Sequence, residues 1–491
     1  MSELASRARL AILWTTGFHV FRDALQFVLM LVLVRMLPAE AYGQFGFMST
    51  ILGFLTLFSF RPFVAHALQV RDDDAADFQR HFTVGLIIQS AVFVAANILA
   101  VVLRFMPAYA PIAPLLHVMS LLFLLDLPCE VRVKMLERQL DWRRLRLLLA
   151  TGIALSAAVS VSLAFTGAGV YALLLPLLVA PAPFIYDLLI TAGWRPTWEW
   201  DRAAYLPAWR FGASRIFAGG FVSSAQLLES TWLSGVLGFA GFGIFNRALG
   251  LSQLACQRTA TLVSTSVYPV LTRIAHRSEA YRRASALLLR AVAWTVVPIA
   301  VFAGLMATEV VTLLYGGRWS MVVPLLPWAM GAGTMVAVIQ PAYLLLLAHD
   351  RQDRCLRADA WRLIGTVVIL LVCLPQGVHA YLAGLALLHA VSLGLILYWL
   401  HEDAAVSFRG VAAALVPPVF AGAIAGAVVL GWTLIPSSSN VVIALAIAGA
   451  LFFSTYLLVL RLLYRELLEE LVGYLPKRRR ISQLLLLPDA A

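Results

Sequence analysis

The sequence predicts an all-α polytopic membrane protein with about 14 transmembrane helices, arranged as two parallel six-helix lobes and two C-terminal helices. Three observations lead to this prediction. Of the 491 residues, 61% are hydrophobic and 13% are charged, and the mean hydropathy is +0.86, far outside the range of soluble domains. Apolar segments long enough to cross a bilayer recur along the whole chain, and a stretch of the first half returns in the second half.

Each predicted span is a mostly apolar segment of roughly 20 residues, the length that a helix needs to cross a bilayer. The segments between them are too short to form a soluble domain. In chain order the predicted spans are 11–36, 43–66, 82–105, 111–131, 145–165, 170–190, 211–235, 240–268, 290–314, 322–347, 357–374, 379–399, 411–434 and 440–460.

The charges between the spans predict the orientation. Basic residues gather in the even-numbered connections, above all in the segment 132–146, whereas the opposite connections carry little beyond Arg35, Arg104 and Arg318. Because basic loops stay in the cytoplasm, both termini are expected there. The predicted divisions are an N-lobe at 1–200 (spans 1–6), a C-lobe at 201–402 (spans 7–12), spans 13–14 at 403–465, and a basic cytoplasmic tail at 466–491.

The basicity and the cysteines exclude several kinds of partner. The net charge of +11 resides mostly in the connections between spans, so it reports topology rather than a nucleic acid partner. The four cysteines show neither CxxC nor histidine spacing, so no metal site is expected. No G-x-x-x-x-G-K-[ST] motif is present, and we expect no ATPase activity and no cofactor.

An internal repeat supports the two-lobe organisation. The stretch LVRMLPAEAYGQF, 33–45, returns as LSGVLGFAGFGIF at 233–245, with Gly43 matched by Gly243 in an ungapped register of 200 residues. A second pair, APLLHVM at 113–119 and VPLLPWAM at 323–330, opens spans 4 and 10. Both pairs are offset by six spans. Because six is even, the two copies begin on the same side of the membrane, which indicates parallel repeats.

Polar side chains interrupt the first span at helical spacing. Thr15, His19, Arg22 and Gln26 fall on one helical face, and Asp23 lies beside them. Ionisable groups inside a membrane are costly and therefore mark functional positions by default. This pattern predicts a polar stripe that lines a water-filled central cavity.

Spans 7 and 8 carry matching stripes. Span 7 has Arg215, Gly219, Gln226 and Glu229 at compatible spacing. The polar residues that share one face of span 8, or flank it, are Asn246, Gly250, Gln253, Gln257, Thr261, Ser264, Arg247 and Arg258.

Two shorter spans add further charges, Arg61 and His66 in span 2 and Asp126 in span 4. The predicted cavity is cationic through Arg22, Arg61, Arg215 and Arg258. Arginine fits phosphate because its planar guanidinium donates bidentate hydrogen bonds. An alternative stays open: Arg22 pairs with Asp23 or Glu229 and holds helices together, while Arg61 and Arg258 reach the interface.

Local motifs add a family resemblance. LVRMLPAEAYG after span 1, MLERQLDWRRL after span 4, GFGIFNRALGL in span 8, VYPVLTRI at its end and LLYGGRWSMVVPLL between spans 9 and 10 resemble the polysaccharide transporter family, also called Wzx-type oligosaccharide flippases. That family belongs to the multidrug/oligosaccharidyl-lipid/polysaccharide (MOP) superfamily of exporters, which includes the MATE transporters. SAQLLESTWLSGVLG resembles the family's span 7 pattern, with Glu229 where an aspartate is usual.

The resemblance implies a flippase and not an enzyme. Its substrate is expected to be an undecaprenyl-pyrophosphate-linked oligosaccharide, moved by alternating access for exopolysaccharide, capsule or O-antigen synthesis. The implied partners are this lipid-linked substrate, membrane lipid, a polysaccharide polymerase and chain-length machinery, with one chain as the transport unit. Asp23, Asp126 and Glu229 are the acids that could couple transport to H+ or Na+. The alternatives are a peptidoglycan-precursor flippase, a multidrug antiporter, or a membrane polysaccharide polymerase or ligase.

Overall fold

The protein is a multi-pass helical membrane protein. The computed structural model describes residues 2–64, 76–200, 202–274, 278–403, 406–434 and 440–473, and these contain helices and no β-strand. Twelve helical segments in this part of the chain are long and apolar enough to cross a bilayer. The all-helical prediction is therefore confirmed, whereas the count of 14 spans is not.

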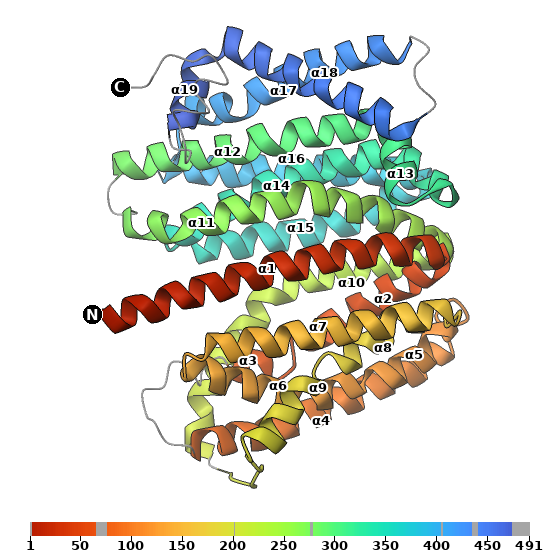
Figure 1. Ribbon diagram of the computed structural model, residues 1–491, viewed down its shortest axis with the longest axis vertical. Helices are drawn as coiled ribbons and strands as arrows, with labels where there is room; N and C mark the ends of the chain where they lie inside the picture. Colours follow the sequence, from red (N-terminus) through yellow and green to blue (C-terminus); the bar gives the residue numbers. More distant parts are fainter. Residues whose placement is uncertain are drawn as a thin grey trace. The chain divides into compact units, whose positions relative to one another are not determined.

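The chain forms two compact units, residues 1–243 and 244–491. The predicted lobe boundaries, which fall elsewhere in the sequence, stay a prediction. The helices of the first unit, drawn from red to yellow in Figure 1, are α1 (Ser2–Met36), α2 (Ala39–Thr56), α3 (Arg61–Val64), α4 (Ala76–Arg104), α5 (Ala113–Met119), α6 (Leu121–Arg138), α7 (Trp142–Phe165), α8 (Tyr171–Val179), α9 (Ala182–Tyr186) and the start of α10 (Arg202–Ser252).

The second unit begins within α10. Its further helices, green to blue in Figure 1, are α11 (Arg258–Ile274), α12 (Ser278–Leu305), α13 (Ala307–Leu314), α14 (Leu326–Ala348), α15 (Gln352–Val372), α16 (Val378–Glu402), α17 (Phe408–Thr433), α18 (Val441–Leu463) and α19 (Arg465–Gly473).

Two breaks explain why spans 2, 7 and 8 differ from the prediction. The predicted span 43–66 is divided, because α2 ends at Thr56 and a separate short helix, α3, follows. Spans 7 and 8 are joined in one long element that bends at Gly238, where φ is 66° and ψ is 171°. A positive φ of this kind is readily accessible only to glycine.

The bend at Gly238 has a counterpart in the first copy of the repeat. Pro38, which occupies the same register, caps α2 with an extended backbone (φ −73°, ψ 160°), directly after α1 ends. Each copy of the repeat thus forms a corner between two long helices. Proline and glycine produce this corner by different means, since one fixes φ and the other permits a positive φ.

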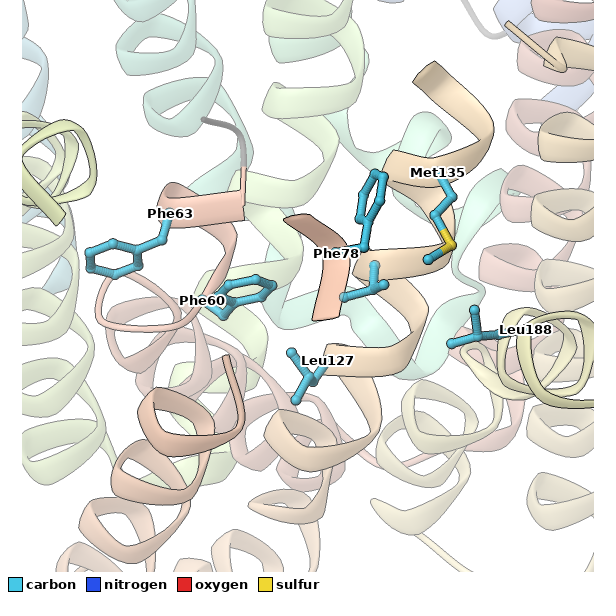
Figure 2. Packing of buried hydrophobic residues seen from close by; sticks show 7 residues of the cluster. Phe60, Phe63, Phe78, Leu127, Met135 and Leu188 are labelled. Carbon is cyan, nitrogen blue, oxygen red and sulfur yellow. The ribbon is translucent and has the colours of Figure 1, made fainter. Parts of the chain in front are cut away.

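The interior of the first unit is built from apolar side chains of several helices. One cluster joins Phe60 and Phe63 at α3 with Phe78 of α4, Leu127 of α6 and Leu188 after α9 (Figure 2). Leu136, Leu145 and Phe184 form a second cluster where α6, α7 and α9 meet. These clusters pack α3, α6 and the start of α7 against their neighbours, and these segments carry most of the charged residues discussed below.

The start of the C-terminal tail packs on the second unit. On α19, Leu468 and Val472 are buried, and Glu470 accepts a hydrogen bond of 2.5 Å from the buried guanidinium of Arg290 on α12. The apolar face of α19 therefore lies against protein. The basic residues Lys477–Arg480 of the predicted tail lie outside the described residues.

Candidate functional site

The polar stripe predicted in the first span lies on α1. Arg22 bonds to its neighbour Asp23, with Nε and Nη2 at 3.0 and 2.9 Å from Oδ1. Its guanidinium lies 6.0 Å from the centre of the Phe18 ring. His19 and Gln26 on the same helix are exposed on the isolated chain. Arg22 thus has a local counter-charge, and its pairing with Asp23 matches one of the two alternatives left open above.

Arg61 belongs to an ion cluster between α3 and α6. Its Nε and Nη2 donate to the two oxygens of Asp126 at 2.7 and 2.6 Å, and Nε also lies 3.1 Å from Oε1 of Glu130. Asp126 is buried, whereas half of the Arg61 side chain is exposed. One arginine is therefore shared by two carboxylates, so this cluster carries a net negative charge when both acids are ionised.

A second cluster contains residues that the sequence analysis did not select. The buried carboxylate of Asp187, in a π-helical turn after α9, accepts from Arg132 on α6 at 2.6 Å. It also accepts from Nε and Nη2 of Arg144 on α7 at 3.0 and 2.6 Å. Here two arginines share one acid and leave a positive excess. The signal in the sequence was the single acid within the apolar run PFIYDLLIT.

The predicted residues of span 7 lie on α10. Gln226 is exposed and Glu229 is half-buried, and the next residue, Ser230, bonds to Thr50 of α2 at 3.0 Å between the two hydroxyl oxygens. Arg215 lies on the same helix, but its side chain is outside the described part of the chain. The cationic character predicted for this span therefore stays a prediction.

The predicted residues of span 8 surround a local change of helix type. Gln253–Gln257 forms a π-helical turn between the end of α10 and α11, a feature often found at functional positions. Gln253 and Arg258 are exposed, and the buried Nδ2 of Asn246 lacks a hydrogen-bond acceptor among the described residues. Thr261 extends the polar face by donating to Gln340 Oε1 of α14 at 3.1 Å.

The structure thus joins Arg22 to Asp23 and Arg61 to Asp126. Glu130, one helical turn after Asp126, and Asp187 with its two arginines were missed. Among the described residues no group of three histidine, cysteine or acidic side chains could hold a metal ion. The arrangement offers guanidinium and amide donors inside membrane-spanning helices, which suits the binding of an anionic, hydrogen-bonding solute rather than covalent chemistry.

Comparison with known families decides the identity. The sequence matches the family model described as polysaccharide biosynthesis protein over residues 32–324, more than half of the chain. The chain belongs to the polysaccharide biosynthesis protein family. The match begins just before the first copy of the repeat and ends within the second pair of repeated motifs, so it includes α2 to α13.

One curated relative is the succinoglycan biosynthesis transport protein ExoT of Rhizobium meliloti (strain 1021). It is 25% identical over 322 residues, which cover 64% of this chain and 63% of that protein. The match thus spans somewhat less than two thirds of the relative's length.

Two solved structures share the fold. An inward closed conformation of the lipid II flippase MurJ superposes with a TM-score of 0.72 at 12% identity, covering 93% of this chain and all of that one. An inward-facing MATE multidrug resistance transporter of the MOP superfamily gives a TM-score of 0.60 at 16% identity, covering 77% of this chain and 94% of that one. At these identities the likeness concerns the fold, and it confirms the predicted MOP-type architecture.

The matched family is described by polysaccharide biosynthesis, the ExoT relative is a transport protein, and the two solved structures are a flippase and a multidrug transporter. The protein is accordingly a multi-pass membrane protein of the polysaccharide biosynthesis family, and the characterised proteins to which it is similar are transporters and flippases rather than enzymes. This confirms the family resemblance that the motifs implied, while transport, its substrate and its mechanism are part of the proposed function.

Proposed function

We propose that this protein is a flippase that moves undecaprenyl-pyrophosphate-linked oligosaccharide repeat units across the bacterial inner membrane. The exported units would be polymerised into an exopolysaccharide, a capsule or an O-antigen. A transport relative named for succinoglycan biosynthesis favours a polysaccharide precursor over a drug. The observation that carries the proposal is the placement of arginine and amide side chains on membrane-spanning helices.

The chemistry of the substrate agrees with this distribution. A pyrophosphate group needs hydrogen-bond donors that carry positive charge, and a glycan needs polar partners. Arg22, Gln26 and Gln226 supply such groups on α1 and α10, whereas Asn246, Gln253, Gln257 and Arg258 supply them around the π-helical turn. The prenyl chain is apolar and can remain in lipid during transfer.

Transport of this kind runs by alternating access through a cationic central cavity, and it needs an energy source. The chain carries no P-loop, so an ion gradient is the expected driving force. Asp23, Asp126 and Glu229 are the candidate sites for H+ or Na+. Asp126 and Glu130 share Arg61, so protonation of one acid would leave the arginine paired with the other. The two pairings of Arg61 would then be the two states between which ion binding switches.

In the proposed orientation both termini lie in the cytoplasm, which the basic connections between the spans favour. The proposed partners are the lipid-linked substrate, membrane lipid, a polysaccharide polymerase and the chain-length machinery, with one chain as the transport unit.

Reconstitution tests the proposal directly. Purified protein in liposomes should transfer an undecaprenyl-pyrophosphate-linked oligosaccharide, labelled on its glycan, from one leaflet to the other, as measured by access of an added glycosidase or lectin. Liposomes with an unrelated membrane protein of similar size provide the background. Transfer at the background rate under both a pH and a Na+ gradient would contradict the proposal.

A second candidate is a flippase for the peptidoglycan precursor, favoured by the likeness of the fold to the lipid II flippase MurJ over 93% of this chain. The two functions are separable in cells. The second candidate predicts that expression rescues growth of a strain depleted of its lipid II flippase, whereas the first predicts that it restores polysaccharide export without such rescue.

A further inference from the structure

A pocket of about 420 Å³ lies between α1 and α7, beside the polar stripe. The two helices pack side by side (Figure 1). Trp14, Phe18 and Phe21 of α1 form one wall, and Arg146 and Leu147 of α7 form the other. The lining is therefore aromatic and apolar apart from a single charged group, the guanidinium of Arg146.

Arg146 is held between aromatic rings. Its guanidinium carbon lies 5.5 Å from the centre of Phe18 and 5.7 Å from that of Trp142. Such contacts stabilise a cation, but they leave its hydrogen-bond donors unused. Among the described residues no carboxylate forms an ion pair with Arg146, and its Nε is buried without an acceptor. A cation placed in this way within a membrane-spanning helix calls for an anionic ligand.

The pocket is continuous with the stripe on α1. The ring of Phe18 lies 5.5 Å from the guanidinium of Arg146 and 6.0 Å from that of Arg22, so two arginines flank the same ring. Arg22 forms an ion pair with Asp23, whereas Arg146 forms none with the carboxylates of the described residues. Two neighbouring guanidinium groups match the two phosphates of a pyrophosphate better than they match a single phosphate.

The depth of the pocket depends on Gly17. This residue belongs to the pocket lining, and a Cβ added to it would meet no atom within 4 Å. A larger side chain could therefore grow into the pocket without displacing protein. The open space at Gly17 next to three aromatic rings suits an apolar chain attached to the anion.

We propose that Arg146 and Arg22 bind the two phosphates of the polyprenyl pyrophosphate carrier, while Trp14, Phe18 and Phe21 contact the first isoprene units of its chain. This inference rests on the proposed function and makes the α1–α7 pocket the place where the carrier is recognised. Arg146 lies in the second turn of α7, which begins at Trp142, so it is close to one end of this span. The two neighbouring guanidinium groups and the aromatic wall favour an isoprenoid pyrophosphate over a bulk phospholipid, which carries a single phosphate and no isoprene chain.

Binding of undecaprenyl pyrophosphate to the full chain in detergent tests the inference, with phosphatidylglycerol as the competing anionic lipid. We expect undecaprenyl pyrophosphate to bind at least about tenfold more tightly than phosphatidylglycerol. Arg146→Met should weaken that binding by roughly ten- to a hundredfold, the usual value of hydrogen bonds to a charged group, and Arg146→Lys should weaken it less. Gly17→Leu should weaken it by filling the pocket while leaving both arginines in place.

Arg104→Met is the matched control, because Arg104 is an exposed arginine of the same unit at the far end of α4. It should bind the carrier as the unchanged chain does. Melting temperatures in detergent check folding, and Arg146→Met should melt close to the unchanged chain, since among the described residues it breaks no ion pair.

Two results would overturn the inference. One is unchanged affinity for undecaprenyl pyrophosphate in both Arg146→Met and Gly17→Leu. The other is equal affinity of the unchanged chain for phosphatidylglycerol, which would make the pocket a general lipid site. Neither result bears on transport itself: if the unchanged chain transfers lipid-linked oligosaccharide in liposomes, the proposed function stands and only the pocket assignment fails.

Discussion

Gly43 and Gly243, which the repeat places in equivalent positions, face each other across direct backbone contacts. A Cβ added to Gly43 would lie 1.8 Å from the carbonyl oxygen of Phe239, and one added to Gly243 would lie 1.9 Å from that of Ala39. Each would also lie within 3.0 Å of the backbone nitrogen of the other glycine. The two repeated corners therefore pack together through their own matched glycines, in a reciprocal manner typical of related copies.

Substitution of either glycine should destabilise the protein. Gly43→Ala and Gly243→Ala each force a methyl group into a backbone carbonyl, and separation of the two helices should cost about 1–3 kcal/mol or more. The measurement is the melting temperature of purified protein in detergent. Gly53→Ala on the same helix is the control, because an added Cβ there meets nothing within 4 Å. Equal melting temperatures for all three variants would contradict the proposed close packing.

Much of the fold could be predicted because the length and apolar composition of a segment identify it as a membrane-spanning helix. The predicted spans 145–165, 379–399 and 440–460 correspond to α7, α16 and α18 within three residues at each end. The break within span 2 was not located from the sequence, because residues 57–60 between α2 and α3 are mostly apolar and the turn that they form depends on tertiary packing. The only sequence signal for the bend at Gly238 was the internal repeat, which aligns Gly238 with Pro38.

The buried acid Asp187 should contribute strongly to stability. Asp187→Asn removes the carboxylate that Arg132 and Arg144 share, and it leaves the nearly buried Arg132 without its counter-charge. Breaking a buried ion pair in this way should lower the free energy of unfolding by about 3–5 kcal/mol. Arg132→Met should cost less, since Asp187 keeps Arg144. The fraction of monodisperse protein that survives a heat challenge measures both variants.

A surface pair provides the control for this comparison. Glu279 pairs with Arg283 on α12, and both side chains are more than half exposed. Glu279→Gln should therefore change stability by only about 0–1 kcal/mol. If Asp187→Asn behaved like Glu279→Gln, the buried cluster would have no structural role.

Labelling at the two ends of α7 tests the orientation. Gln139 precedes this helix and Thr166 follows it, and both are exposed. The 24-residue helix is about 36 Å long at 1.5 Å per residue, enough to span the bilayer. With the four native cysteines replaced, Thr166→Cys should react with a membrane-impermeant maleimide in intact spheroplasts. Gln139→Cys should react only after permeabilisation, and the reverse pattern would invert the topology.

The candidate site was less predictable than the fold. Helical spacing placed Arg22 and Gln26 on one face of α1, but it could not show which acid each arginine meets. Arg61 and Asp126 are 65 positions apart, and Arg132 and Asp187 are 55 apart, so their pairing is set by how the helices pack. Arg146 was taken for a loop charge because it ends the basic segment 132–146, and only the packing of α1 on α7 gives it a pocket.

Variants of Arg22 separate a role in transport from a role in holding the protein together. If Arg22 binds pyrophosphate, Arg22→Ala should lower polysaccharide export by roughly ten- to a hundredfold at normal abundance, the effect expected for losing a hydrogen bond to a charged group. Arg22→Lys should retain part of the export, because the charge remains while the bidentate geometry is lost. We expect Arg215→Ala to behave like Arg22→Ala, since both residues were predicted to line the cavity. The measurement is export in a flippase-deleted strain, normalised to folded protein in the membrane.

The pairing of Arg22 with Asp23 supplies the decisive comparison. If the pair only stabilises α1, with its Nε–Oδ1 distance of 3.0 Å, then Arg22→Ala should reduce the amount of folded protein by leaving Asp23 without this partner. Adding Asp23→Asn to Arg22→Ala should then restore both abundance and export, because no charge is left unpaired. If Arg22 contacts the substrate, the double variant should fold well and still fail to export. Full export by the double variant would therefore remove Arg22 from the transport mechanism.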